Sequence, residues 1–134
     1  MTIVAFSGTV DKLMSVGILT SGAVAMGMDV DIYLTFWGLQ ALRQGAPPHV
    51  TKMSSDYGEM APMMMQLIQE KNMPSWLDTL RQAKELGNVK VHACANTMDL
   101  MGMTREDLDP MVDDVVGVAE YVELARNSEI TLFI

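Results

Sequence analysis

The chain has 134 residues, of which 49% are hydrophobic and 19% charged, a composition that excludes intrinsic disorder and a fibrous architecture and suits one packed core. Its formal net charge of −8 and its lack of a Lys/Arg cluster argue against nucleic acid as a partner, because phosphates would be repelled. A single cysteine cannot form an internal disulfide, and no signal-peptide pattern opens the sequence, so we expect a cytoplasmic protein.

The first third of the chain predicts a βαβ unit. Residues 2–6 are apolar and rich in β-branched side chains, as in a strand buried on both faces of a parallel sheet. Asp11 is the expected N-cap of a helix that runs to Met26 and stops at Gly27, and residues 30–36 are rich in strand formers. Residues 13–28 are uncharged, but this run is shorter than the roughly 20 residues that cross a bilayer, so we expect no membrane span.

The middle of the chain is rich in methionine. Residues 38–44 predict a short helix that ends at Gly45, and two prolines follow. The next stretch, residues 53–73, holds six methionines and shows no single clean hydrophobic period before about Ala61, after which we expect a short helix. Within a single domain of residues 1–134 we therefore predict a mobile or interface-forming excursion at about residues 47–73. Because it adds more apolar surface than a small core can cover, we expect a homo-oligomer.

The second half continues the alternation of helices and strands. A helix is predicted over residues 76–86, and residues 89–93 predict a strand that ends at Cys94. The core-facing residues of that helix are Leu77, Leu80 and Ala83. A capping box at residues 104–107, a short strand at 115–116, an amphipathic helix at 118–126 and a strand at 130–134 complete the chain. This alternation predicts a three-layer α/β/α fold with about five mainly parallel strands.

Cys94 is the residue that we predict to carry the chemistry. Ligands bind beyond the carboxyl ends of parallel strands, where Ser7-Gly8, Trp37-Gly38 and Cys94 are expected. The polar residues Asn96 and Thr97 can cap a helix that starts there and aims backbone N–H groups at the sulfur. Such a position lowers the pKa of a cysteine, and the thiolate is the form that accepts and donates sulfane sulfur. The alternative is a small buried hydrophobic residue.

Other chemistries have weaker signals. His92 lies two residues before Cys94, so a regular strand points both side chains toward the same face of the sheet. Three roles are then open to the histidine: a base, a metal ligand, or a hydrogen-bonded structural residue. We favour the structural role, because zinc needs about four ligands and His49 sits at no diagnostic spacing. Methionines with Cys94 could hold Cu(I), although methionine more often fills cores and binding surfaces. With no GxGxxG or P-loop and no paired carboxylates, we predict no cofactor and no metal.

Three stretches in combination resemble one protein family. They are Phe-Ser-Gly at 6–8 with Asp-Lys at 11–12, Leu-Thr-Phe-Trp-Gly-Leu at 34–39, and Ala-Cys at 93–94 with Met-Asp-Leu-Met-Gly-Met at 98–103. Together they resemble the DsrE/DsrF-like sulfurtransferase family, in the sulfur-trafficking branch often labelled peroxiredoxin family. No peroxidatic motif or resolving cysteine supports that label.

The resemblance implies a flavodoxin-like fold, assembly into homo-oligomers, and a persulfide carried on Cys94. The residues expected to line the site are Ser7, Gly8, Trp37, Gly38, Asn96, Thr97 and Met98. The implied function is a sulfur carrier or sulfurtransferase, whose donors and acceptors would be a TusA-type carrier, a rhodanese or a lipoate-bearing protein. The alternatives are an oligomeric scaffold protein with a structural Cys94, and a Cu(I)-binding protein.

Overall fold

A single parallel sheet organises the molecule. The computed structural model describes residues 1–47 and 50–134. Within these residues the sheet has five strands in the order β4-β3-β2-β1-β5, and every neighbouring pair is parallel. The strands are β1 (Thr2–Ala5), β2 (Val30–Leu34), β3 (Val89–Cys94), β4 (Asp114–Val116) and β5 (Thr131–Phe133).

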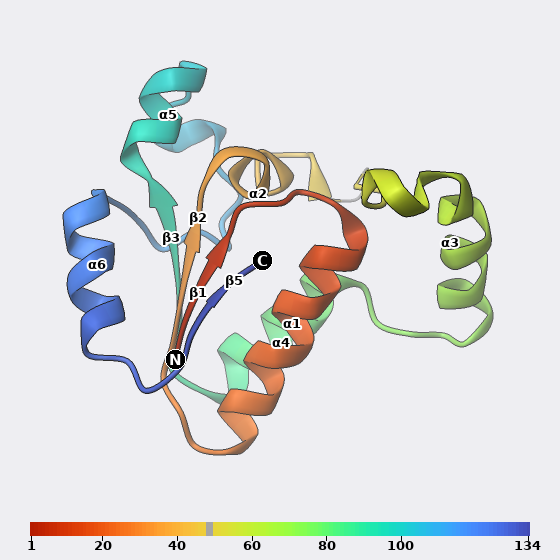
Figure 1. The fold of residues 1–134 in the computed structure, drawn as a ribbon, viewed down its shortest axis with the longest axis horizontal. Helices are drawn as coiled ribbons and strands as arrows, with labels where there is room; N and C mark the ends of the chain where they lie inside the picture. Colours follow the sequence, from red (N-terminus) through yellow and green to blue (C-terminus); the bar gives the residue numbers. More distant parts are fainter. Residues whose placement is uncertain (48–49) are drawn as a thin grey trace.

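Helices cover both faces of this sheet, which confirms the predicted three-layer α/β/α architecture. Helices α1 and α4 lie side by side on one face, and α6 lies on the other (Figure 1). The helices are α1 (Val10–Ala25), α2 (Phe36–Ala41), α3 (Ala61–Glu70), α4 (Trp76–Leu86), α5 (Ala95–Met101) and α6 (Val118–Arg126), with short 3-10 helices η2 (Ser55–Met60) and η3 (Arg105–Asp107).

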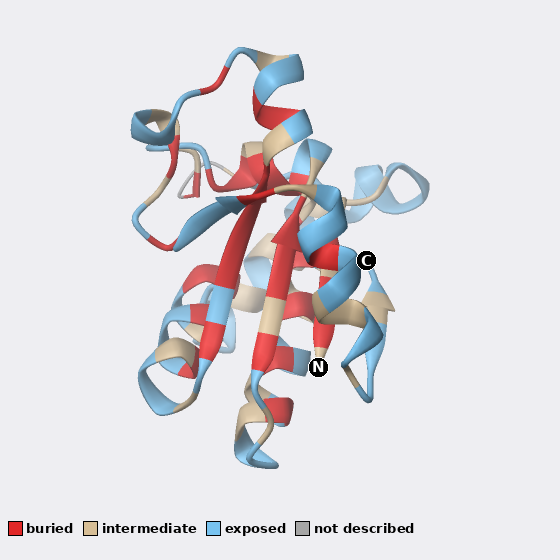
Figure 2. Cartoon of the chain, turned by 90° about the vertical axis from the view of Figure 1, so that its left-hand side faces the viewer, coloured by how far each residue is buried: buried red, intermediate tan, exposed pale blue. Residues whose placement is uncertain are grey.

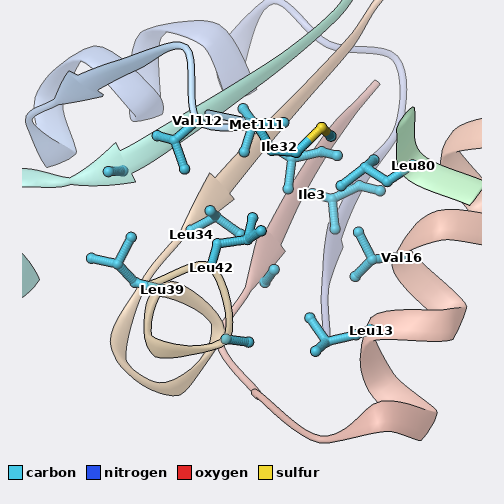
Figure 3. Packing of buried hydrophobic residues seen from close by; sticks show 14 of the residues in the cluster. Ile3, Leu13, Val16, Ile32, Leu34, Leu39, Leu42, Leu80, Met111 and Val112 are labelled. Atoms are coloured by element: carbon cyan, nitrogen blue, oxygen red, sulfur yellow. The ribbon is translucent and has the colours of Figure 1, made fainter. Parts of the chain in front are cut away.

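The larger core lies between the sheet and the α1/α4 layer. Alternate residues of the central strands, such as Ile3 and Ile32, are fully buried and face Val16 of α1 and Leu80 of α4 (Figure 3). A smaller cluster lies on the opposite face, beneath α6, where Cys94 is buried. The central strands are buried for most of their length, which explains their continuous apolar sequences (Figure 2).

Most of the predicted elements are confirmed, and two helix starts are corrected. Helix α6 spans the predicted residues, and the predicted capping box opens η3. The strand β2 ends at Leu34, two residues before the predicted end, so helix α2 starts at Phe36 and spans Phe36–Ala41 in place of the predicted residues 38–44. The N-cap of α1 is Thr9, not Asp11. The carboxylate of Asp11 instead accepts hydrogen bonds from the backbone N–H and the hydroxyl of Ser54.

The segment formed by η2 and α3 extends away from the sheet (Figure 1). Neither helix, each described along its whole length, contains a buried residue. Met60, Met63 and Leu67 are each at least two-fifths exposed. In the described part of the chain, no helix has the length and apolar character to cross a bilayer.

Candidate active site around Cys94

The end of β3 places Cys94 beneath α6. Cys94 is the last residue of β3 and the N-cap of α5, with extended backbone angles. Val91 and Ala93 point into the larger core, so the alternation of a strand turns His92 and Cys94 toward α6. Only 6% of Cys94 is exposed.

A pocket of about 320 Å³ opens beside the sulfur. It is lined by Tyr33, Thr35, Phe36, Cys94, Asn96, Thr97, Leu100 and Val118. None of these described lining residues is charged. The cysteine therefore sits in a largely apolar recess whose polar groups are hydroxyls and one amide.

Thr97 ties the loop after β2 to α5. The hydroxyls of Thr35 and Thr97 share a hydrogen bond of 3.0 Å, and the backbone N–H of Phe36 donates to the Thr97 hydroxyl at 3.2 Å. Phe36 has a φ of 45°, a left-handed conformation that is uncommon for a bulky residue. The Thr97 hydrogen bond helps to hold this strained backbone, and such strain concentrates at functional sites.

The surroundings of Cys94 favour its thiolate. Burial by itself raises the pKa of the thiol, but hydrogen bonding outweighs it and leaves the pKa below its usual value. The groups that lower it are the Thr97 and Tyr33 hydroxyls, the backbone N–H of Thr97 and the Thr35 hydroxyl. The pocket therefore stabilises an anionic sulfur without a neighbouring cation.

Two tyrosines, Tyr33 and Tyr121, belong to the same buried cluster as Cys94. The rings of Tyr33 in β2 and Tyr121 in α6 stack with centroids 4.6 Å apart and planes 18° apart. Both hydroxyls are buried and, among residues 1–47 and 50–134, neither has a hydrogen-bond partner of standard geometry. Burial, and then the proximity of Cys94 and Tyr121, raise the pKa of Tyr33, which keeps its hydroxyl protonated as a donor.

His92 is held by two carboxylates on the same face as Cys94. Its Nε2 lies 2.9 Å from an oxygen of Asp31, and its Nδ1 lies 2.6 Å from an oxygen of Asp114. Burial lowers the pKa of His92, but the hydrogen bonds and charges of the two aspartates outweigh this and raise the pKa overall. Both ring nitrogens are thus occupied, which matches the structural role that we favoured from the sequence.

The structure divides the lining residues expected from the sequence into three groups. Asn96 and Thr97 line the Cys94 pocket. Ser7, Gly8 and Trp37 line a separate pocket of about 420 Å³.

The remaining two expected lining residues, Met98 and Gly38, contribute to packing and not to a pocket. Met98 is buried in the larger core. Gly38 packs so closely on β1 that a Cβ atom would lie 2.1 Å from the carbonyl oxygen of Ala5.

Sequence reasoning missed Tyr33, Thr35 and Tyr121. The signal for Tyr33 was the alternation within β2, which places Asp31 and Tyr33 on the face opposite Ile32. No local pattern could have paired it with Tyr121, because that contact joins two elements far apart in the sequence. Within the described residues, no group of three or more His, Cys, Asp or Glu side chains could hold a metal ion. His49 lies outside the described residues.

Comparison with known proteins decides the family. The model of the DsrE/DsrF/DrsH-like family matches residues 1–61 and 49–133, which is nearly the whole chain. The chain belongs to this family. The family resemblance predicted from the sequence is therefore confirmed, and it covers both the Cys94 pocket and the η2/α3 segment.

Two curated proteins are similar to this chain over nearly their full lengths. Uncharacterized protein YrkE of Bacillus subtilis is 33% identical over 156 residues, an alignment that covers 99% of this chain and 95% of the relative. Sulfur carrier protein DsrE2 of Allochromatium vinosum is 30% identical over 156 residues, with 100% of this chain and 97% of the relative covered.

Solved structures share the fold of this family member. The YchN protein of E. coli matches with a TM-score of 0.61, and MTH1491 of Methanobacterium thermoautotrophicum, a protein of unknown function, with a TM-score of 0.51. Each match has 18% sequence identity and covers 99% of this chain and 97% of the other. At this identity the matches establish the shared flavodoxin-like α/β fold.

Proposed function

We propose that this family member is a sulfur carrier that holds sulfane sulfur as a persulfide on Cys94 and passes it to a partner protein. The observation that carries the proposal is the position of this one cysteine, in an uncharged pocket whose hydrogen bonds lower its pKa. Membership of the DsrE/DsrF/DrsH-like family and the 30% identity to a protein named as a sulfur carrier support it.

The proposed transfer requires only a thiolate nucleophile. The Cys94 thiolate attacks the outer sulfur of a donor persulfide, R–S–SH, and a bond forms between Sγ and that sulfur while the donor S–S bond breaks. The donor leaves as R–S⁻, and the outer sulfur with its proton becomes Cys94–S–SH, which ionises to the persulfide anion. No net oxidation occurs, and an acceptor thiolate removes the sulfur by the same exchange.

The rim of the pocket is suited to contact with a protein partner. Phe36 lines the pocket, and its ring packs against Phe6, which in turn stacks on Phe133. Phe36 is 39% exposed and Phe133 is 71% exposed. An exposed aromatic surface beside a buried nucleophile supports delivery between proteins, with a TusA-type carrier, a rhodanese or a lipoate-bearing protein as donor or acceptor. We place this exchange in the cytoplasm.

The decisive experiment is sulfur loading of purified protein. Wild type and Cys94→Ser are incubated with polysulfide or with a persulfidated donor, and intact-mass spectrometry follows the gain of sulfur. We expect wild type to gain sulfur and Cys94→Ser to gain none, while circular dichroism shows that the variant stays folded. A folded wild type that gains no sulfur from any donor would refute the carrier function and favour the scaffold alternative. Loss of folding in Cys94→Ser would indicate that the cysteine is structural.

A further inference from the structure

The buried hydroxyls of Tyr33 and Tyr121 are a feature of the Cys94 cluster that apolar packing alone does not explain. Both residues are more than nine-tenths buried, with 5% and 8% exposed. Neither hydroxyl has a hydrogen-bond partner of standard geometry among the described residues, although the Tyr33 hydroxyl lies close enough to Cys94 to help lower the pKa of its thiol. Burying a hydroxyl without a partner is destabilising, and most buried polar groups in proteins are hydrogen-bonded, so two such hydroxyls at one place require an explanation.

The position of Tyr33 points to a ligand at Cys94. Tyr33 lines the same pocket as the cysteine and belongs to the same buried cluster, together with Tyr121. The stacked rings place the two tyrosines next to each other within that cluster. The missing partner of these hydroxyls is therefore expected on the Cys94 side.

A persulfide supplies such a partner. Its S–S bond is about 2.05 Å long, so the outer sulfur extends about 2 Å beyond Sγ. A hydropersulfide is a stronger acid than a thiol, and the outer sulfur is therefore an anion near neutral pH. In a pocket whose described lining residues are uncharged, that anion has to be stabilised by hydrogen-bond donors.

Resting on the proposed carrier function, we infer that the Tyr33 and Tyr121 hydroxyls form a subsite for sulfane sulfur, in which Tyr33 donates to the persulfide anion on Cys94. The Tyr121 ring holds Tyr33 in position by stacking, and its own hydroxyl is the second donor. Hydrogen bonds of standard geometry, which both hydroxyls lack in the unloaded protein, form when the sulfur arrives.

The other titratable groups around Cys94 do not fill this role. On the same face of the sheet, His92 is hydrogen-bonded to both Asp31 and Asp114. Asp99, in α5, is exposed. Among the described residues that line the pocket or share the buried cluster with Cys94, Tyr33 and Tyr121 are the titratable groups other than the cysteine itself.

The test uses the three tyrosines of the chain, Tyr33, Tyr57 and Tyr121. Tyr33→Phe and Tyr121→Phe keep the stacked rings and remove only the hydroxyls, and Tyr57→Phe is the matched control, since Tyr57 lies 59% exposed in η2. Each protein is loaded with polysulfide, the excess is removed, and the persulfide on Cys94 is followed over time by intact mass. The Cys94 pKa is measured in parallel from the rate of alkylation against pH.

We expect Tyr33→Phe to lose its sulfur about tenfold faster than wild type and to raise the Cys94 pKa, since a hydrogen bond to a charged group is lost. Tyr121→Phe should shorten the persulfide lifetime less, and Tyr57→Phe should match wild type. The temperature of thermal unfolding of Tyr33→Phe should be unchanged or slightly higher than that of wild type, because the buried hydroxyl that is removed makes no hydrogen bond of standard geometry in the unloaded protein.

The two proposals fail in different ways. If wild type carries the persulfide and Tyr33→Phe retains it equally long, the subsite is refuted and the carrier function stands. If wild type gains no sulfur, the carrier function falls, and the subsite for a persulfide falls with it. A drop in stability without a change in persulfide lifetime would assign Tyr33 a structural role and overturn the inference.

Discussion

The hydroxyl of Thr35 lies 3.0 Å from the hydroxyl of Thr97, although 62 positions separate the two residues in the chain. This contact joins the loop after β2 to the first turn of α5, and both threonines line the Cys94 pocket. The Thr97 hydroxyl also accepts from the backbone N–H of Phe36 and helps to lower the pKa of Cys94. One side chain therefore shapes the pocket and activates the thiol.

Thr97→Val should impair both roles of that side chain. The substitution keeps the shape but leaves the Phe36 N–H and the Thr35 hydroxyl without this partner, which should destabilise the protein by about 1–3 kcal/mol. The Cys94 pKa should rise, because a hydrogen bond to the thiolate is lost. Urea unfolding and the pH dependence of alkylation measure the two effects. Thr97→Ser, which keeps the hydroxyl, should restore the pKa, and an unchanged pKa in Thr97→Val would contradict the prediction.

The pairing of His92 with Asp31 and Asp114 should make stability depend on pH. The pKa of His92 is raised in the folded protein, so the protonated ring stabilises the fold fully below its unfolded pKa of about 6.5. This contribution is lost as the pH rises through the higher folded value. We therefore expect His92→Asn to destabilise the protein more at low pH than at high pH.

Urea unfolding of both proteins between about pH 5.5 and pH 9 measures this difference. The difference in the free energy of unfolding between wild type and His92→Asn should become smaller as the pH rises. A difference in the free energy of unfolding that stays constant over this pH range would show that His92 contributes packing alone.

Gly38 should not tolerate a methyl group. Its Cβ would lie 2.1 Å from the carbonyl oxygen of Ala5, a backbone atom that cannot move without disturbing β1. We expect Gly38→Ala to destabilise the protein by about 3 kcal/mol or more, at the upper end of overpacking effects. Gly22→Ala in α1, where the added Cβ meets no atom within 4 Å, should instead stabilise it by about 0.5–1 kcal/mol. Thermal and urea unfolding of the two variants should move in opposite directions.

The exposed apolar side chains of α3 should contribute to a homo-oligomer. Met63 and Leu67 are 47% and 40% exposed on a helix without buried residues. Met63→Glu with Leu67→Glu should reduce the molecular mass in solution, because charge on an interface opposes association. Light scattering measures the mass, and circular dichroism should show an unchanged fold.

Leu86→Glu provides a control for that experiment, since Leu86 is 81% exposed at the end of α4. It should leave the oligomer intact. A wild-type protein that is a monodisperse monomer at micromolar concentration would refute the interface.

The sequence by itself determined the elements whose signals are local. The alternation within residues 89–93, the helical spacing of Leu77, Leu80 and Ala83, and the capping box at Thr104 depend on neighbours a few residues apart, and each is found in the structure. The position of Cys94 at the end of a strand followed from the same reasoning. The start of α2 could not be predicted in this way. It depends on the left-handed backbone of Phe36, whose N–H donates a hydrogen bond to the hydroxyl of Thr97, a residue distant in sequence.

Only the tertiary structure decided what surrounds the cysteine. The strand order places β2 between β1 and β3, so Ser7-Gly8 and Cys94 do not end on neighbouring strands. The chain after β1 passes to α1 on one face of the sheet, while Cys94 faces α6 on the other. The pairing of β2 with β3 brings Tyr33 close to Cys94, and the packing of α6 on the sheet adds Tyr121 to the same cluster. Both arrangements depend on residues remote in sequence and leave no local pattern.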